Sequence, residues 1–170
     1  LWSEVTARRV ERLNRESKGV IIGGGGLLLQ DTNPNPNSGW QWNCSIENLR
    51  KLDVPIAVFA VGFNQFRDQD DFDPIFSEHI TEVVARSVFF SLRNRGSIAR
   101  LAEYLSADIA SRLVYQPCPT TVLRFLYPEL LQPNARERQR LALNTAFDRW
   151  PLRFGDNVEH VLSELAKAMR

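Results

Sequence analysis

Two kinds of hydrophobic spacing alternate along the first 130 residues of the chain. Short runs rich in Val, Ile and Phe predict strands, and segments with an apolar residue at every third or fourth position predict helices. The predicted strands cover residues 20–22, 56–61, 88–93 and 112–117. The predicted helices cover an arginine-rich segment before residue 20 and residues 46–52, 73–87 and 95–107.

Strands that alternate with helices predict an α/β fold, here a Rossmann-like parallel sheet flanked by helices. The segment "IAVFAV" at residues 56–61 is apolar on both faces, as is typical of a strand in a sheet covered on both sides. Pro74 stands in the first turn of its helix, where proline is tolerated. Ser97 is interpreted as the N-cap of the helix that follows the third strand.

The pattern changes after residue 130. Residues 131–140 are charged and interrupted by proline, which favours a linker between domains. Residues 141–150 predict a strand and residues 156–170 an amphipathic helix, which together are interpreted as the start of a second α/β domain. The first domain then covers residues 1–130. Because the sequence begins at Leu1 without methionine, we expect an internal segment of a longer protein.

Composition narrows the classes of function. The 170 residues are 44% hydrophobic and 24% charged, and the net charge is +1, which gives no strong case for nucleic acid. No apolar run approaches the ~20 residues that span a bilayer, and the charged start does not resemble a signal peptide. Cys44 and Cys118 favour reduced thiols and a cytoplasmic location. The spacing of cysteines and histidines predicts no metal site, and we expect no cofactor. The oligomeric state stays open.

Four consecutive glycines at positions 23–26 follow the first predicted strand. Ligands of open α/β sheets bind beyond the carboxyl ends of the strands. Bare backbone at Gly24, Gly25 and Gly26 would admit a ligand there, or offer N–H groups to an anion. The segment matches neither the dinucleotide-binding nor the P-loop motif. A tight turn packed against a neighbouring helix is the alternative interpretation.

Polar side chains also follow the second and third predicted strands. An arginine beside a helix N-terminus favours phosphate or carboxylate, although a single arginine more often pairs with a surface carboxylate. Taken together, the strand ends predict an anion-binding site. Its expected members are Gly24, Gly25, Gly26, Asn64, Arg67, Arg93 and Ser97.

Other candidates have simpler interpretations. Trp40 and Trp42 would either stack on a sugar or anchor their loop to the domain. His79 and His160 fall in predicted helices and are interpreted as packing or surface residues. The aspartates between residues 68 and 73 are interpreted as helix caps and a solvated loop.

Four segments between residues 19 and 123 occur in a characteristic order: "VIIGGGGLLLQD", "PIAVFAVGFNQF", "FFSLRNRGSIARL" and "LVYQPCPTTVL". The series resembles the polysaccharide pyruvyl transferase family, which shows a strand into a triple-glycine turn, a strand ending in Val-Gly, a strand into Arg-Asp-x-x-Ser and a strand into Pro-Asp-Pro. Arg93 and Ser97 match the family arginine and serine. Asn94 and Cys118 stand where the family has aspartates, which puts an acid–base role of these two positions in doubt.

The resemblance implies a GT-B-like protein of two Rossmann-like domains, of which this chain holds the N-terminal one without its first strand. It implies transfer of a pyruvyl group from phosphoenolpyruvate to a sugar hydroxyl in cell-surface polysaccharide biosynthesis. The partners would be phosphoenolpyruvate and a sugar or polysaccharide precursor. The resemblance is also compatible with peripheral association with a membrane assembly. No catalytic acid or base is identified in this chain. We therefore expect it to be inactive alone.

Two alternatives of other classes stay open. A GT-B nucleotide-sugar glycosyltransferase would have the same shape, and its donor would bind mainly to the second domain. A non-catalytic homologue acting as a binding domain is compatible with the two absent carboxylates. Fold alone does not decide among these functions.

Overall fold

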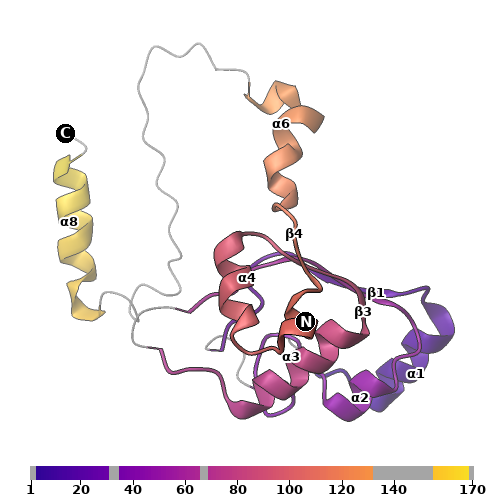
Figure 1. Ribbon diagram of the computed structural model, residues 1–170. Helices are drawn as coiled ribbons and strands as arrows, with labels where there is room; N and C mark the ends of the chain where they lie inside the picture. Colours follow the sequence, from indigo (N-terminus) through magenta and orange to yellow (C-terminus); the bar gives the residue numbers. More distant parts are fainter. Residues whose placement is uncertain (1–2, 31–34, 66–68, 132–154, 169–170) are drawn as a thin grey trace. The chain divides into compact units, whose positions relative to one another are not determined.

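The computed structural model of the chain describes residues 3–30, 35–65, 69–131 and 155–168 (Figure 1). The chain divides into two compact units, Leu1–Pro128 and Glu129–Arg170. The first unit contains all of the described strands and the candidate site, and it is described first.

The first unit is built on a four-stranded parallel sheet in the order β1-β2-β3-β4. The strands are β1 (Val20–Gly23), β2 (Ile56–Val61), β3 (Ser87–Leu92) and β4 (Leu113–Tyr115). Helices connect them, so the predicted Rossmann-like α/β fold is confirmed. Since all four strands run the same way, their carboxyl ends form one edge of the sheet, called the carboxyl edge below.

The helices of the first unit follow the predicted pattern closely. Their bounds are α1 (Ala7–Glu16), α2 (Ile46–Arg50), α3 (Pro74–Arg86), α4 (Arg95–Ala102), α5 (Ala107–Ala110) and α6 (Leu123–Leu126), with the short 3-10 turn η1 (Pro119–Val122). Pro74 occupies the first turn of α3, as predicted. The long helix expected at residues 95–107 is shorter, because α4 ends at Ala102 and α5 begins at Ala107.

One hydrophobic core lies between the sheet and the helices. The strands contribute residues such as Ile22, Val58 and Phe90, and α3 contributes Phe76 and Ile80, all fully or almost fully buried. The burial of one apolar stripe of α3 accounts for its place against the sheet.

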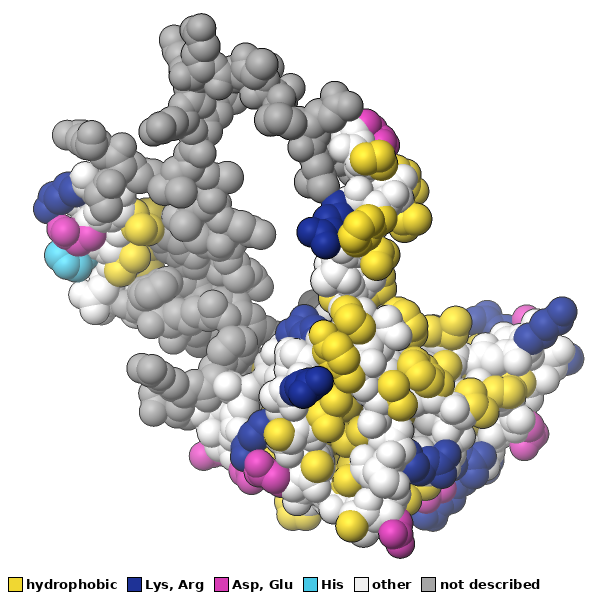
Figure 2. Space-filling view, turned by 45° about the horizontal axis from the view of Figure 1, so that its top comes forward, with side chains coloured by type: hydrophobic (Ala, Val, Ile, Leu, Met, Phe, Trp, Pro, Cys, Tyr) yellow, Lys and Arg dark blue, Asp and Glu magenta, His cyan; other side chains and the backbone are white. Residues whose placement is uncertain are grey.

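The two faces of the sheet differ in exposure. Consecutive parallel strands joined by right-handed connections place their helices on the same face. Figure 1 shows α1, α2 and α3 together on one side of the strands. On the opposite face Ile21 is 80% and Val88 71% exposed, so within the described residues the sheet is covered on one side only. The covering of both faces that the apolar pattern of β2 predicts is therefore not seen in this part of the chain. With the top of that view turned forward, Figure 2 shows hydrophobic side chains in a band across this unit.

The second unit is described at η2 (Pro128–Leu131), which begins on the last residue of the first unit, at η4 (Gly155–Asn157) and at α8 (Val158–Ala168). Helix α8 confirms the amphipathic helix predicted near the end of the chain. The strand predicted at residues 141–150 and most of the predicted linker lie outside the described residues. The proposed division into a first domain, a linker and a second α/β domain therefore stays a prediction.

Candidate functional site

A distortion of the sheet shapes the carboxyl edge at the end of β2. The pairing of β2 with β3 shifts register between Val58 and Val61, and Ala60 between them adopts a φ of 51°. The buried Ser91 on β3 holds the distortion, because its Oγ accepts from the Ala60 N–H at 2.9 Å and donates to the Val58 carbonyl at 3.1 Å. Left-handed backbone is costly for alanine, and bulges of this kind often re-aim residues beside functional sites.

Gly62 directly follows this distortion and lies beneath a guanidinium. A Cβ added at Gly62 would stand 2.6 Å from Cζ of Arg93, closer than real contacts allow. The Arg93 backbone N–H donates to the Val61 carbonyl at 2.9 Å, which aligns the two strand ends. Glycine at position 62 therefore leaves room for the side chain of Arg93, which lies across its backbone.

Gly26 and Asn64 form a second contact of the same kind. A Cβ added at Gly26 would stand 2.8 Å from Cγ of Asn64. Asn64 in turn accepts a hydrogen bond from Nη2 of Arg93 at 3.1 Å. The structure thus brings together Gly26, Asn64 and Arg93, three residues that the sequence places in one predicted site.

Gly24 and Gly25 have a different reason to be glycine. Their φ angles are 84° and 77°, in the left-handed region that favours glycine, and no atom of the described residues lies within 4 Å of a Cβ added to either. Both residues are exposed. The Gly25 carbonyl accepts from the Gly62 N–H at 2.9 Å, which ties this turn to the end of β2. The amides of Gly25 and Gly26 donate no hydrogen bond to any described residue.

The start of α4 corrects one prediction. Asn94, not Ser97, is the N-cap, and its Oδ1 accepts from the Ser97 N–H at 2.7 Å. Ser97 lies in the first turn, is buried, and its Oγ accepts from the Phe63 N–H at 3.0 Å. Asparagine caps helices as well as aspartate does, so Asn94 keeps the structural role of the carboxylate that it replaces in the pattern. Ser97 joins α4 to the segment after β2.

Arg93 is half-buried and makes no ion pair among the described residues. The alternative that it pairs with a surface carboxylate is therefore not seen in this part of the chain. A planar guanidinium has five N–H donors, and only one hydrogen bond of its side chain is formed here. Arg67, the other predicted cation, lies outside the described residues.

Cys118 follows β4 at the same edge. Its Sγ accepts from Oγ1 of Thr120 at 3.1 Å. Hydrogen bonds from the Thr120 side chain and backbone hold the pKa of the Cys118 thiol below its usual range, and Arg93 adds an attractive charge. The buried Cys44 is the opposite case, since burial raises its pKa to about 12. Neither cysteine forms a disulfide.

The tryptophans and His79 serve the core. Trp40 and Trp42 are buried, so their loop is anchored to the domain and the alternative of stacking on a sugar does not hold. Trp40 Nε1 donates to Nδ1 of His79 at 3.0 Å, and burial lowers the pKa of His79 to about 4. His79 is thus a packing residue, as predicted.

The sequence does not reveal the role of Ser91 and Ala60, two buried residues that shape the carboxyl edge. Neither residue type signals a bulge, and the contact between them joins two strands. No group of three or more His, Cys, Asp and Glu residues suited to a metal ion occurs in the described ranges.

Comparison with known proteins gives one match. A family model described as polysaccharide pyruvyl transferase matches residues 3–164. No curated protein and no solved structure matches the chain.

Proposed function

Because the chain belongs to the polysaccharide pyruvyl transferase family, we propose that its carboxyl edge binds phosphoenolpyruvate for transfer of a pyruvyl group to a sugar hydroxyl. The acceptor would be a sugar or precursor of a cell-surface polysaccharide. Membership of the family rests on the match over residues 3–164.

One observation carries the proposal: the guanidinium of Arg93 lies at the carboxyl edge and, among the described residues, forms a single side-chain hydrogen bond, to Asn64. Phosphoenolpyruvate presents a phosphate and a carboxylate, and a guanidinium recognises either through two parallel hydrogen bonds. The amides of Gly25 and Gly26 are unused among the described residues and lie on the same edge. An anion with two negatively charged ends suits a site that combines a cation with backbone N–H groups that have no acceptor among the described residues.

The proposed reaction determines which groups the site must supply. The vinyl carbon of phosphoenolpyruvate takes up one proton. Two hydroxyl oxygens of the sugar bond to the neighbouring carbon, and the bond from that carbon to the phosphate oxygen breaks. Of the two hydroxyl protons released, one balances the proton added to the vinyl carbon and the other leaves with phosphate. An acid and a base are needed for these transfers. Arg93, Asn64 and the glycine turn can bind and orient the donor, and none of them is a carboxylic acid or an imidazole. We therefore propose that the acid and base come from other parts of the protein and that this chain alone forms no ketal.

A cytoplasmic location, with peripheral association with a membrane assembly, belongs to the same proposal. Of the helices in the described ranges, none is long and apolar enough to cross a membrane.

Calorimetric titration with phosphoenolpyruvate tests the proposal. We expect saturable binding to the 170-residue chain and loss of binding in Arg93→Ala. Binding should be weakened in Arg93→Lys, which keeps the positive charge but cannot form the two parallel hydrogen bonds of a guanidinium. Arg50→Ala is the matched control, because Arg50 is exposed and already pairs with Glu82 at 3.3 Å. Binding that ignores Arg93, or tighter binding of a UDP-sugar than of phosphoenolpyruvate, would overturn the proposal.

A further inference from the structure

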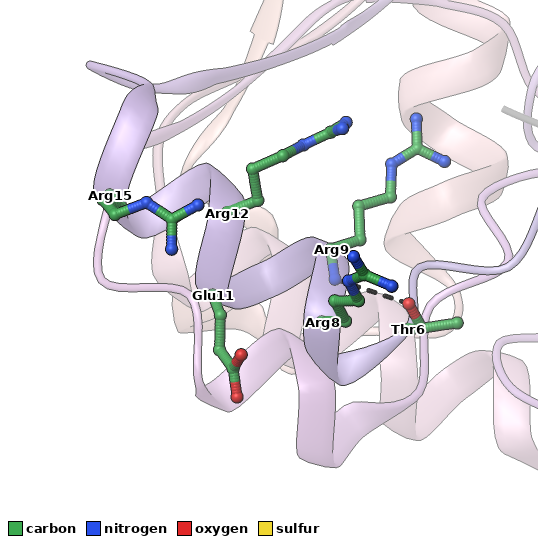
Figure 3. Close-up of a pocket in the computed structure, with 6 residues that line it drawn as sticks. All are labelled: Thr6, Arg8, Arg9, Glu11, Arg12 and Arg15. Carbon is green, nitrogen blue, oxygen red and sulfur yellow. Dashed lines mark hydrogen bonds between the residues drawn. The ribbon is translucent and has the colours of Figure 1, made fainter.

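A row of arginines on α1 lies apart from the residues of the proposed site. Arg8, Arg9, Arg12 and Arg15 line a hollow of about 680 Å³ together with Thr6 and Glu11. Figure 3 shows Arg9 and Arg12 extended to the same side of the helix, with Glu11 on the opposite side. Figure 2 shows Lys and Arg side chains gathered at the end of the first unit where α1 lies.

The helix that carries these arginines is firmly held. Val10, on the other face of α1, is buried in the core. The side chain of Asn14 donates to the Lys51 carbonyl at 2.7 Å and to Asp53 at 3.1 Å, and the Asp53 N–H donates back to Asn14 at 3.0 Å. The apolar face of α1 is therefore used for packing, and its arginine face is presented on a fixed support.

The arginines are poorly neutralised by the chain. Arg8 and Arg12 make no hydrogen bond or ion pair through their side chains with any described residue. Arg9 donates to the neutral Ser3 Oγ at 3.0 Å, and of the four arginines only Arg15 pairs with a described carboxylate, that of Glu16 at 2.6 Å. Like charges one turn apart destabilise a helix by about 0.2–0.5 kcal/mol per pair. An anion placed between the arginines would relieve this repulsion.

The spacing of the arginines selects the kind of anion. Arg8 and Arg12 are about 6 Å apart along the helix axis, and Arg8 and Arg15 about 10 Å. A single carboxylate offers one edge to one guanidinium, whereas phosphates carry oxygens on several sides and can bridge neighbouring guanidiniums. An array of adjacent phosphates therefore matches an array of arginines better than isolated carboxylates do.

We propose that the arginine face of α1, formed by Arg8, Arg9, Arg12 and Arg15, binds a ligand with two or more adjacent phosphate groups. Such an array occurs in a soluble di- or polyphosphate and in neighbouring headgroups of an anionic phospholipid surface. The proposal does not depend on the proposed pyruvyl transfer, since it involves none of the residues at the carboxyl edge.

Two probes test the proposal and separate the sources. Tripolyphosphate is titrated into the 170-residue chain at low salt, and the chain is sedimented with vesicles of phosphatidylcholine with and without phosphatidylglycerol. In the Arg8→Gln/Arg12→Gln variant we expect at least about tenfold weaker binding and a smaller dependence on salt concentration. Binding of tripolyphosphate alone assigns a soluble ligand, and binding that requires phosphatidylglycerol assigns a lipid surface.

A charge-matched control and an edge variant make the test decisive. Arg124→Gln/Lys167→Gln removes the same charge from α6 and α8, and circular dichroism verifies that all variants are folded. We expect this control and Arg93→Ala to bind within about twofold of the unchanged chain. Binding of neither probe, equal weakening in the control, or loss of tripolyphosphate binding in Arg93→Ala would overturn the proposal.

Discussion

Two polar contacts in the first unit join segments far apart in the sequence and differ in their access to water. At the carboxyl edge, half-buried Arg93 donates to Asn64 and keeps donors to spare. In the core, Trp40 donates to His79, whose ring is fully buried. The edge contact leaves a charge available to a ligand, whereas the core contact keeps its ring neutral and fixes packing. Changes at the edge should therefore alter binding, and changes in the core should alter stability.

Gly62→Ala should have the largest effect, and it should fall on binding. The added Cβ would displace the guanidinium of Arg93, so we expect affinity for phosphoenolpyruvate to fall about ten- to one hundredfold, because hydrogen bonds to charged groups contribute about 1.5–3 kcal/mol. The crowded atoms belong to the free end of a flexible side chain. We therefore expect the free energy of unfolding to change by less than about 0.5 kcal/mol. Calorimetric titration and urea unfolding measure the two quantities.

Gly96→Ala is the matched control at the same edge, since its added Cβ would meet only Asn94 Oδ1, at an ordinary distance of 3.4 Å. Equal losses of affinity in Gly62→Ala and Gly96→Ala would show that the contact between residue 62 and Arg93 does not determine the affinity for phosphoenolpyruvate.

Acid should weaken the fold through His79. Its pKa is lowered from 6.5 to about 4 by burial, so the unfolded chain binds a proton more readily than the folded chain. The stabilisation from this neutral ring is present above pH 6.5 and is lost as the pH falls toward 4. We expect the free energy of unfolding to be about 2 kcal/mol lower at pH 5 than at pH 7.

Denaturant unfolding at the two pH values measures this dependence. His79→Asn keeps a hydrogen-bond acceptor for Trp40 and cannot titrate, so the difference should shrink in that variant. The exposed His160, changed to Asn, is the control and should leave the difference intact. A pH dependence that survives His79→Asn would place its origin in other groups.

Gly24→Ala should destabilise the fold by about 1 kcal/mol, because a φ of 84° is unfavourable for alanine. No described residue lies within 4 Å of the added Cβ, so Arg93 should keep its position. If phosphoenolpyruvate occupies the space beside Gly24, its affinity should also fall. Gly155→Ala carries a similar backbone penalty, with a φ of 53°, and should leave affinity unchanged. Unchanged affinity in Gly24→Ala would remove the glycine turn from the proposed site.

Ala60→Gly should have the smallest effect, a gain of about 0.5 kcal/mol in the free energy of unfolding. Glycine relieves the cost of a φ of 51°, and part of this gain is offset by the greater freedom of glycine in the unfolded chain. Thermal unfolding detects a change of this size. A loss of stability would indicate that the Ala60 side chain contributes more to the buried core than its backbone costs.

The sequence predicts the elements of the fold well because their signals are local. Apolar runs mark the strands, and the stripe that includes Phe76 and Ile80 marks α3. The approach of Asn64 and Arg93 to one edge follows from the parallel order of the strands, and it was predicted for that reason.

The details of the edge depend on contacts between strands, which local patterns do not contain. The role of Gly62 depends on where Arg93 lies, and the bulge at Ala60 depends on Ser91 in the neighbouring strand. The preference of serine for N-caps predicts Ser97 as the cap, but Asn94 precedes it and forms the cap instead. The arginines of α1 are visible in the sequence, but their shared hollow and missing partners are evident only in the structure.

A crystal structure of the chain with phosphoenolpyruvate tests the central claim most directly. We predict that a phosphate or carboxylate oxygen of the ligand lies within hydrogen-bond distance of the Arg93 guanidinium, over the turn at Gly24 and Gly25. Phosphoenolpyruvate bound on the arginine face of α1, or bound anywhere without touching Arg93, would contradict it.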